Sequence, residues 1–201
     1  MNEKKNLTIE ETFALAVQNH QKNNLKIAEN LYKKILKKNP NHASSHNNLG
    51  LIFHAYKDFQ KAKSSYQKAI EIQPNYANAY NNLGLILKAL GERKKAIDAY
   101  EKAISINPNF VQTHNNLGLI FYGLGEFQKA KSSYQRAIEI QPNFSDAYNN
   151  LGIIFKELGE SQKAIHCYKK AIQIQPNYPG AYLNLGNIVK ELGEYQKAKN
   201  F

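Results

Sequence analysis

The sequence predicts an all-α protein built as a solenoid of helix–turn–helix repeats. A Leu-Gly pair and a proline each recur at a strict period of 34 residues, and the apolar residues between them follow helical spacing. Two-helix repeats of this length stack into a quasi-one-dimensional array in which each unit packs on its neighbours. The recurring residues are Leu49-Gly50, Leu83-Gly84, Leu117-Gly118, Leu151-Gly152 and Leu185-Gly186, with Pro74, Pro108, Pro142 and Pro176.

The start of the chain predicts a flexible segment followed by a capping repeat. Residues 1–8 are polar, and Thr8 followed by Glu11 has the spacing of a capping box, so the first helix should begin there. Residues 9–42 keep an Ala-x-x-x-aromatic spacing at Ala28 and Tyr32 but otherwise diverge from the later copies. A divergent first repeat is typical of the cap of a solenoid.

The rest of the chain divides into four full repeats and a partial one. Glycine readily adopts the left-handed conformation that ends a helix, so Gly91, Gly125, Gly159 and Gly193 should mark the turns. Lys57 takes this place in the first full repeat and should cost it some stability. The last copy leaves an apolar face uncovered, which would allow end-to-end self-association. The full repeats span 43–76, 77–110, 111–144 and 145–178, and the partial repeat spans 179–201.

These residues resemble the tetratricopeptide repeat family, over residues 9–201. His46 and His114 stand where the family prefers Trp or Tyr. The resemblance implies a right-handed superhelix, or α-solenoid, that binds peptides or proteins and carries no cofactor. In the second full copy the matching residues are Tyr80, Leu83, Gly84, Leu87, Ala96, Tyr100 and Pro108.

Each first helix has a predicted core face. Repeat positions are counted from Ala43, Ala77, Val111, Ser145 and Pro179. At 100° per residue, positions three, seven, ten, eleven and fourteen share one side. In the second full copy these positions are Ala79, Leu83, Ile86, Leu87 and Leu90.

The opposite side of the first helices carries the candidate binding residues, because the resemblance implies that first helices line a concave groove. Two asparagine columns and an apolar column would form this groove, with further residues on its rim. Position six has Asn48, Asn82, Asn116, Asn150 and Asn184; position five has Asn47, Asn81, Asn115 and Asn149; position nine has Leu51, Leu85, Leu119 and Ile153; the rim has Lys88, Tyr122 and Lys156.

The repeated asparagines predict binding of an extended peptide. An amide offers both a donor and an acceptor, which matches the alternating groups of a peptide backbone, while leucines accept apolar side chains. The columns are similar to the asparagine ladder in the repeats of O-linked N-acetylglucosamine transferase. The rim lysines would favour an acidic ligand. The alternative is that these amides form hydrogen bonds between repeats and have a structural role.

A basic ridge on the second helices and a net charge of +11 raise anionic surfaces as a further alternative. Most such ridges keep a solenoid soluble, and exposed aromatic residues that could stack bases are not evident, so nucleic acid is not the expected partner. The ridge comprises Lys61, Lys95, Lys129, Lys163 and Lys197 at position nineteen, with Lys68, Lys102, Arg136 and Lys170 at position twenty-six.

The sequence offers no support for catalysis, a metal site or a membrane span. There is no phosphate loop, nucleophile elbow or zinc-protease motif, and no paired carboxylates face the groove. His42 and His46 have chelating spacing but no third ligand, and Cys167 is a lone thiol. No apolar run approaches the ~18 residues of a span, and the N-terminus is unlike a signal peptide. We therefore expect a cytoplasmic protein that is not an enzyme and has no small-molecule substrate.

Taken together, these features predict a protein-interaction scaffold. The main alternative is a substrate-recruiting arm of a larger enzyme, such as a glycosyltransferase whose catalytic domain lies outside this sequence. Groove binding predicts that Asn82→Ala with Asn116→Ala reduces capture of a partner. Binding through the lysine ridge instead predicts steep salt dependence.

Overall fold

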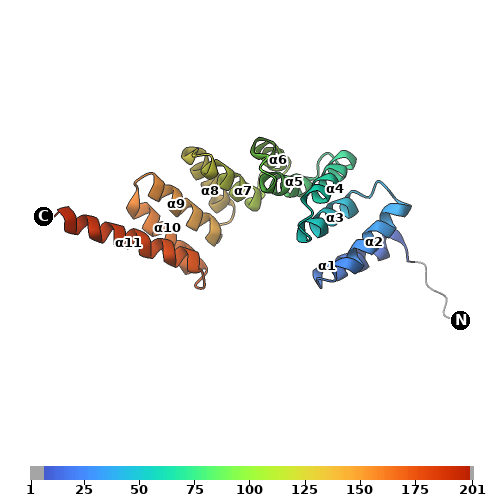
Figure 1. Ribbon diagram of the computed structural model, residues 1–201, viewed down its shortest axis with the longest axis horizontal. Helices are drawn as coiled ribbons and strands as arrows, with labels where there is room; N and C mark the ends of the chain where they lie inside the picture. The colour runs from blue at the N-terminus through green and yellow to red at the C-terminus, as the bar shows by residue number, and fades with distance from the viewer. Residues whose placement is uncertain (1–6, 200–201) are drawn as a thin grey trace. The chain divides into compact units, whose positions relative to one another are not determined.

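A computed structural model of the chain describes residues 7–199, with side chains described as far as residue 193. The regular structure of this part is helical, and consecutive helices form antiparallel pairs (Figure 1). This confirms the all-α solenoid predicted from the repeats. The helices are α1 (Ile9–Gln21), α2 (Leu25–Lys38), α3 (Ala43–Ala55), α4 (Phe59–Ile72), α5 (Ala77–Ala89), α6 (Arg93–Ile106), α7 (Val111–Gly123), α8 (Phe127–Ile140), α9 (Ser145–Glu157), α10 (Ser161–Ile174) and α11 (Pro179–Lys199).

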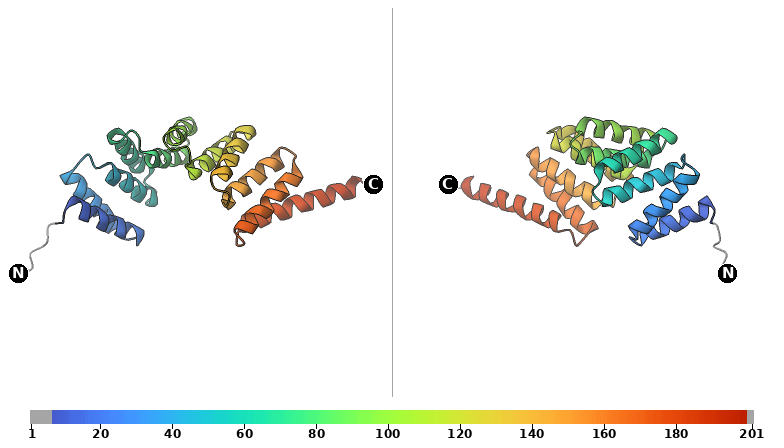
Figure 2. Two further views of the ribbon diagram at one scale, coloured as in Figure 1. Left: turned by 180° about the vertical axis from the view of Figure 1, so that it is seen from behind. Right: turned by 45° about the vertical axis from the view of Figure 1, so that its right-hand side comes forward.

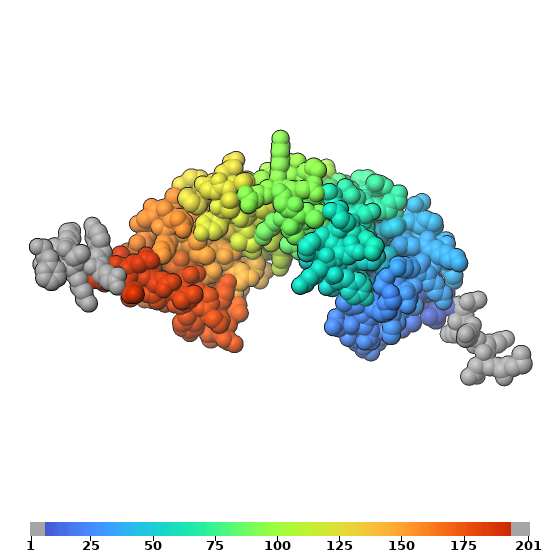
Figure 3. Space-filling model, in the orientation of Figure 1, coloured from blue at the N-terminus to red at the C-terminus, as the bar shows by residue number. Residues whose placement is uncertain are grey.

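The helices belong to two compact units. Unit 1 extends to Ile106 and contains α1 to α6, whereas unit 2 starts at Asn107 and contains α7 to α11. Within each unit a second helix packs on the first helix of its own repeat and on that of the next: α4 contacts α3 and α5, and α8 contacts α7 and α9 (Figure 2). Atoms of α2 and α3 meet without a gap in the space-filling view (Figure 3). Each unit is therefore a stack of repeats.

The turn between the two helices of a repeat is left-handed, as predicted. Gly91, Gly125 and Gly159 have φ angles of 77°, 75° and 74°. Asn23 and Lys57 occupy the same place with φ of 60°. Side chains adopt this region at an energetic cost, which is smaller for asparagine than for most residues. Copies that lack the glycine thus form the same turn because the packing of the two helices requires it.

The core of each repeat is a tyrosine ring placed against a glycine. A Cβ atom added to Gly50, Gly84, Gly118 or Gly152 would lie 2.5 to 2.6 Å from the ring of the tyrosine sixteen residues later. These positions accept no side chain without movement of the ring. The tyrosines Tyr66, Tyr100, Tyr134 and Tyr168, with Tyr32 in the first repeat, are each at most 1% exposed.

The last repeat differs from its prediction. Gly193 does not form a turn; it lies inside α11, which continues to Lys199 and extends beyond α9 and α10 (Figures 1 and 2). Gly186, the glycine of the last Leu-Gly pair, has no atom within 4 Å of where its Cβ would be. Among the described residues, no second-helix ring therefore covers Gly186 as Tyr168 covers Gly152.

The predicted core positions are confirmed except for the last. Ala79, Leu83, Ile86 and Leu87 are buried, and Leu90 at position fourteen is half-buried. At the same position Tyr56 is 45% exposed and Leu124 is 41% exposed. Position fourteen is the C-cap of each first helix, where the chain leaves for the turn, so its side chain lies at the edge of the helix pair.

Candidate peptide-binding surface

The first helices of successive repeats contact one another within each unit: α3 with α5, α7 with α9, and α9 with α11. We call the surface formed by positions five, six and nine of these helices the first-helix face. The side chains at positions six and nine are half-buried in every full repeat, so part of each side chain is exposed to solvent. Asn48 and Leu51 on α3, and Asn82 and Leu85 on α5, follow this pattern.

In unit 1 the asparagines of the first-helix face form a continuous chain of hydrogen bonds. Asn82 Nδ2 donates to Asn47 Oδ1 of the preceding repeat at 3.1 Å. Asn47 Nδ2 donates to Asn48 Oδ1 at 3.2 Å, and Asn48 Nδ2 donates to the Tyr32 hydroxyl at 3.1 Å. Asn81 Nδ2 completes the chain by donating to Asn82 Oδ1 at 3.4 Å. The amides of two successive repeats, together with the Tyr32 hydroxyl of the repeat before them, therefore fix one another's orientation.

Unit 2 contains the same bond between repeats. Asn150 Nδ2 donates to Asn115 Oδ1 at 3.1 Å, and Asn184 Nδ2 donates to Asn149 Oδ1 at 2.9 Å. The acceptors are at position five and the donors at position six, as in unit 1. Burial separates most of the two columns: Asn47, Asn115 and Asn149 are 5%, 8% and 7% exposed, whereas Asn81 and all five position-six asparagines are half-buried. Position five thus bonds between repeats, and position six remains accessible.

Aromatic and basic side chains flank the face. The Tyr122 ring lies 6.0 Å from that of Phe127, and the His54 ring lies 6.0 Å from that of Phe59. Lys88 is exposed.

Lys156, at the position of Lys88 in a later repeat, forms an ion pair with Glu191 of α11 at 2.7 Å.

The last repeat departs from the asparagine pattern at position five, since Leu183 replaces the asparagine and is 65% exposed.

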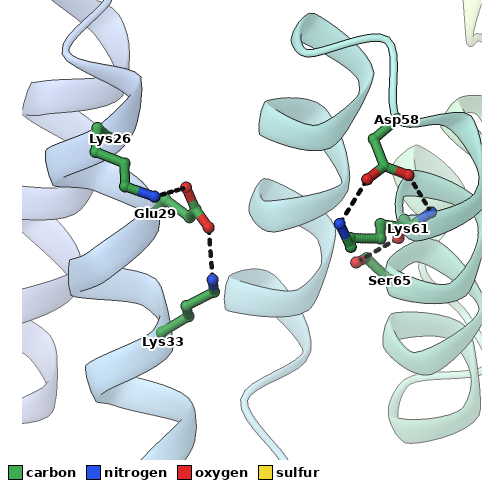
Figure 4. A network of polar contacts seen from close by, with 6 residues as sticks. All are labelled: Lys26, Glu29, Lys33, Asp58, Lys61 and Ser65. Carbon is green, nitrogen blue, oxygen red and sulfur yellow. Dashed lines mark hydrogen bonds and ion pairs between the residues drawn. The ribbon is translucent and has the colours of Figure 1, made fainter.

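The predicted basic ridge is largely neutralised by nearby acids. Each position-nineteen lysine from Lys61 to Lys163 pairs with the acid three residues earlier, at the start of its helix. Figure 4 shows the first of these pairs, Lys61 with Asp58. The hydrogen bond between Lys61 and Asp58 lowers the pKa of Asp58 and raises that of Lys61. At position twenty-six, Lys68 pairs with Glu71 and Arg136 with Glu139. The ridge is therefore less cationic than its lysine count implied, although the i, i+3 spacing could have indicated the pairing.

Two polar features escaped the sequence reasoning. Glu29 is only 4% exposed and pairs with Lys26 at 3.2 Å and Lys33 at 2.5 Å (Figure 4). The hydrogen bond from Lys33 is the main reason that the pKa of Glu29 lies below its ordinary value. In the aromatic slot, the Nε2 atoms of His46 and His114 hydrogen-bond to the carbonyl oxygens six residues earlier, each at 2.9 Å. Both features stabilise the repeats.

The described residues provide no metal cluster or reactive thiol. Across residues 7–193, no three His, Cys, Asp or Glu side chains gather where they could hold an ion. His42 instead caps α3, accepting a hydrogen bond from the Ser45 backbone at 3.2 Å. Cys167 is 5% exposed, and burial raises the pKa of its thiol to about 11. Among the described helices, none is long and apolar enough to cross a membrane.

Two-helix repeats stacked through a buried tyrosine–glycine core define the chain as an α-solenoid protein. Tetratricopeptide repeat models match residues 43–76, 77–110, 111–144 and 145–178, and a further model of this repeat matches residues 167–200. The chain belongs to the tetratricopeptide repeat family.

Solved structures share this fold. A crystal structure of MamA has 29% identity and a TM-score of 0.72, covering 80% of this chain and 94% of that one. PilF of Pseudomonas aeruginosa has 19% identity and a TM-score of 0.84, covering 96% and 87%. YrrB, described as a TPR protein with an unusual peptide-binding site, has 23% identity and a TM-score of 0.70, covering 87% and 90%. Comparison with curated proteins found no match.

Proposed function

We propose that this chain is a non-catalytic protein-interaction scaffold whose first-helix faces bind extended segments of other proteins. The observation that carries the proposal is the hydrogen-bonded asparagine network, which fixes the half-buried position-six amides beside partly exposed leucines. Amides held in place before a ligand arrives lose little conformational entropy on binding.

The remaining hydrogen-bonding capacity of the amides suits a peptide backbone. Asn82 uses one N–H to reach Asn47 and one lone pair to accept from Asn81. A primary amide has two N–H donors and two lone pairs, so one of each remains available. An extended backbone presents donors and acceptors alternately and could pair with successive position-six amides, while Leu85 receives an apolar side chain. The buried position-five asparagines would act by holding the position-six amides in register.

Family membership and YrrB support the class of ligand. YrrB has the same fold and is described as having a peptide-binding site. A net charge of +11 favours an acidic segment, and we propose that the protein acts in the cytoplasm. The same faces would serve either a free-standing scaffold or the recruiting arm of a larger enzyme, and the experiment below tests the faces themselves.

The test is selection of a random dodecapeptide library displayed on phage, followed by fluorescence anisotropy of the enriched peptides. Two paired variants address the units separately: Asn48→Ala with Asn82→Ala, and Asn150→Ala with Asn184→Ala. Losing two hydrogen bonds of about 1 kcal/mol each should weaken binding to the affected unit by about tenfold or more.

A matched control carries Asn75→Ala with Asn109→Ala, two exposed asparagines in the loops between repeats. This variant removes the same chemistry away from the first-helix faces and should bind as the wild type does. Thermal unfolding followed by circular dichroism checks that each variant is folded. If folded face variants and the control bind all enriched peptides equally, the proposal is wrong.

A further inference from the structure

Successive repeats are not equivalent; they alternate between two types with a period of two repeats. Position twelve is aromatic in one type and lysine in the other, and position seventeen is phenylalanine only in the first type. Position four alternates between histidine and tyrosine, and position twenty-one between lysine and isoleucine. Along the full repeats the residues are His46, Tyr80, His114 and Tyr148; His54, Lys88, Tyr122 and Lys156; Phe59, Arg93, Phe127 and Ser161; Lys63, Ile97, Lys131 and Ile165.

The alternation matches the division of the structure into units. Unit 1 contains one full repeat of each type, in α3 to α6, and unit 2 contains one of each type, in α7 to α10. The internal geometry of the pairs is also the same. The bond from Asn82 to Asn47 and the bond from Asn150 to Asn115 are both 3.1 Å long. The His54–Phe59 and Tyr122–Phe127 ring separations are both 6.0 Å.

We infer that the chain carries two peptide sites of the same layout, one on the first-helix face of each unit, so that one chain binds two copies of the same short segment. The inference rests on the proposed function and extends it by fixing the number of sites and the pattern of the ligand. Each site comprises the aromatic rim residue of one repeat, the asparagine pair and leucine column, and the lysine of the next repeat. The aromatic rim residue and the lysine are His54 and Lys88 in unit 1, and Tyr122 and Lys156 in unit 2.

The spacing of these elements sets the ligand's chemistry. Within a site, the aromatic residue and the lysine share position twelve on first helices that contact each other, α3 with α5 and α7 with α9. Packed helix axes lie about 9 Å apart, which an extended chain covers in about three residues of about 3.3 Å each. The segment should therefore carry an apolar or aromatic side chain and an acidic side chain about three residues apart.

The lysines make the two sites similar but not identical in affinity. Lys88 is exposed, whereas Lys156 is engaged with Glu191 of α11 at 2.7 Å. An acidic ligand residue must compete with Glu191 in unit 2. The unit 1 site should therefore discriminate more strongly in favour of an acidic residue.

Isothermal titration calorimetry with one peptide enriched in the phage selection tests the number of sites. The wild type should bind two peptides per chain. Asn82→Ala and Asn150→Ala should each weaken one of the two sites about fivefold and leave the other unchanged. His54→Ala and Tyr122→Ala provide a second pair of variants, because their rim side chains are not part of the tyrosine–glycine core. Each should weaken one of the two sites about tenfold and leave the other unchanged.

The outcomes separate this inference from the proposed function. One peptide per wild-type chain, bound more weakly by Asn82→Ala and also by Asn150→Ala, would overturn the two-site inference and leave the proposed function standing. Two peptides bound with no response to any of the four substitutions would place binding elsewhere and overturn both. Failure of the selection to enrich any binding peptide would also contradict both.

Discussion

Three of the full repeats and the last helix carry the same local signal but adopt different structures. The sequence Leu-Gly-Glu occurs at residues 90–92, 124–126, 158–160 and 192–194. At the first three places the glycine has φ near 75° and the chain turns back. At the fourth, Gly193 is helical within α11. The local signal therefore permits a turn without imposing one.

The difference lies in what covers the preceding Leu-Gly pair. Tyr100, Tyr134 and Tyr168 come from the second helix and cover Gly84, Gly118 and Gly152, whereas Gly186 is uncovered. The residues on the uncovered face of α11 include Tyr182 and Val189, each 52% exposed. We conclude that burial of the second-helix tyrosine against the glycine stabilises the two-helix repeat, and that the turn follows from it.

Removing a covering tyrosine should have the largest effect on stability. Tyr134→Ala would leave Gly118 as open as Gly186 and create a cavity in unit 2. Loss of a large buried ring costs about 3–5 kcal/mol. Urea unfolding followed by circular dichroism measures the change. Tyr182→Ala is the matched control, because its ring is half exposed, and it should change stability by less than about 0.5 kcal/mol.

The thiol of Cys167 should report how well the full repeats exclude solvent. Its pKa of about 11, against an ordinary 9.0, lowers the thiolate fraction about 100-fold at pH 8. Alkylation by iodoacetamide should therefore be at least about 100-fold slower in folded than in urea-unfolded protein.

The same shift implies a pH dependence of stability. The folded state retains the proton between pH 9 and 11, so the stability present below pH 9 is lost as the pH rises toward 11. Cys167→Ala should lose this part of the alkaline dependence. In the alkylation experiment above, an equal rate in the folded and the unfolded protein would contradict burial of the Cys167 thiol.

A pair of glycine substitutions compares a covered position with the open one. Gly118→Ala places a Cβ 2.6 Å from the Tyr134 ring and should destabilise unit 2 by about 1–3 kcal/mol. Gly186→Ala meets no atom within 4 Å and should stabilise α11 by up to about 1 kcal/mol, since alanine favours helix over glycine. Urea midpoints of the two variants should move in opposite directions. Equal destabilisation would mean that Gly186 is covered in solution.

The smallest expected effect compares the two turn glycines. Gly159→Ala forces a side chain into a φ of 74° and should cost about 1 kcal/mol. Gly193→Ala lies in a helix and should gain about 1 kcal/mol or slightly less. Thermal unfolding would resolve the opposite signs. A loss of stability in both variants would indicate that Gly193 forms the predicted turn in solution.

Much of the fold followed from the sequence because the repeat supplies the same evidence several times. Helix periodicity, the Thr8 capping box and the left-handed turns at Gly91, Gly125 and Gly159 were all predicted correctly. The turn at Gly193 was predicted wrongly, because the prediction used local residues, whereas in the full repeats the turn is accompanied by a tyrosine packed on the preceding Leu-Gly pair. The prediction that position fourteen lies in the core was wrong for a related reason. Helical phase alone does not reveal that Tyr56 and Leu124 lie at a C-cap.

The candidate site was predictable as a pattern but not as a network. The sequence identified the asparagine columns and allowed both peptide binding and bonding between repeats. It could not show that Asn47, Asn115 and Asn149 at position five are buried and accept from the position-six amides of the next repeat. That depends on the offset between packed helices. Peptide binding by these residues remains a prediction.

The most direct test of the central claim is nuclear magnetic resonance of the asparagine side-chain amides during titration with an enriched peptide. The account predicts shifts for the Nδ2 resonances of Asn48, Asn82 and Asn150, and none for Asn75 or Asn109 in the exposed loops. Shifts confined to the loops or to the second-helix lysines, with the first-helix asparagines unchanged, would contradict binding on the first-helix faces.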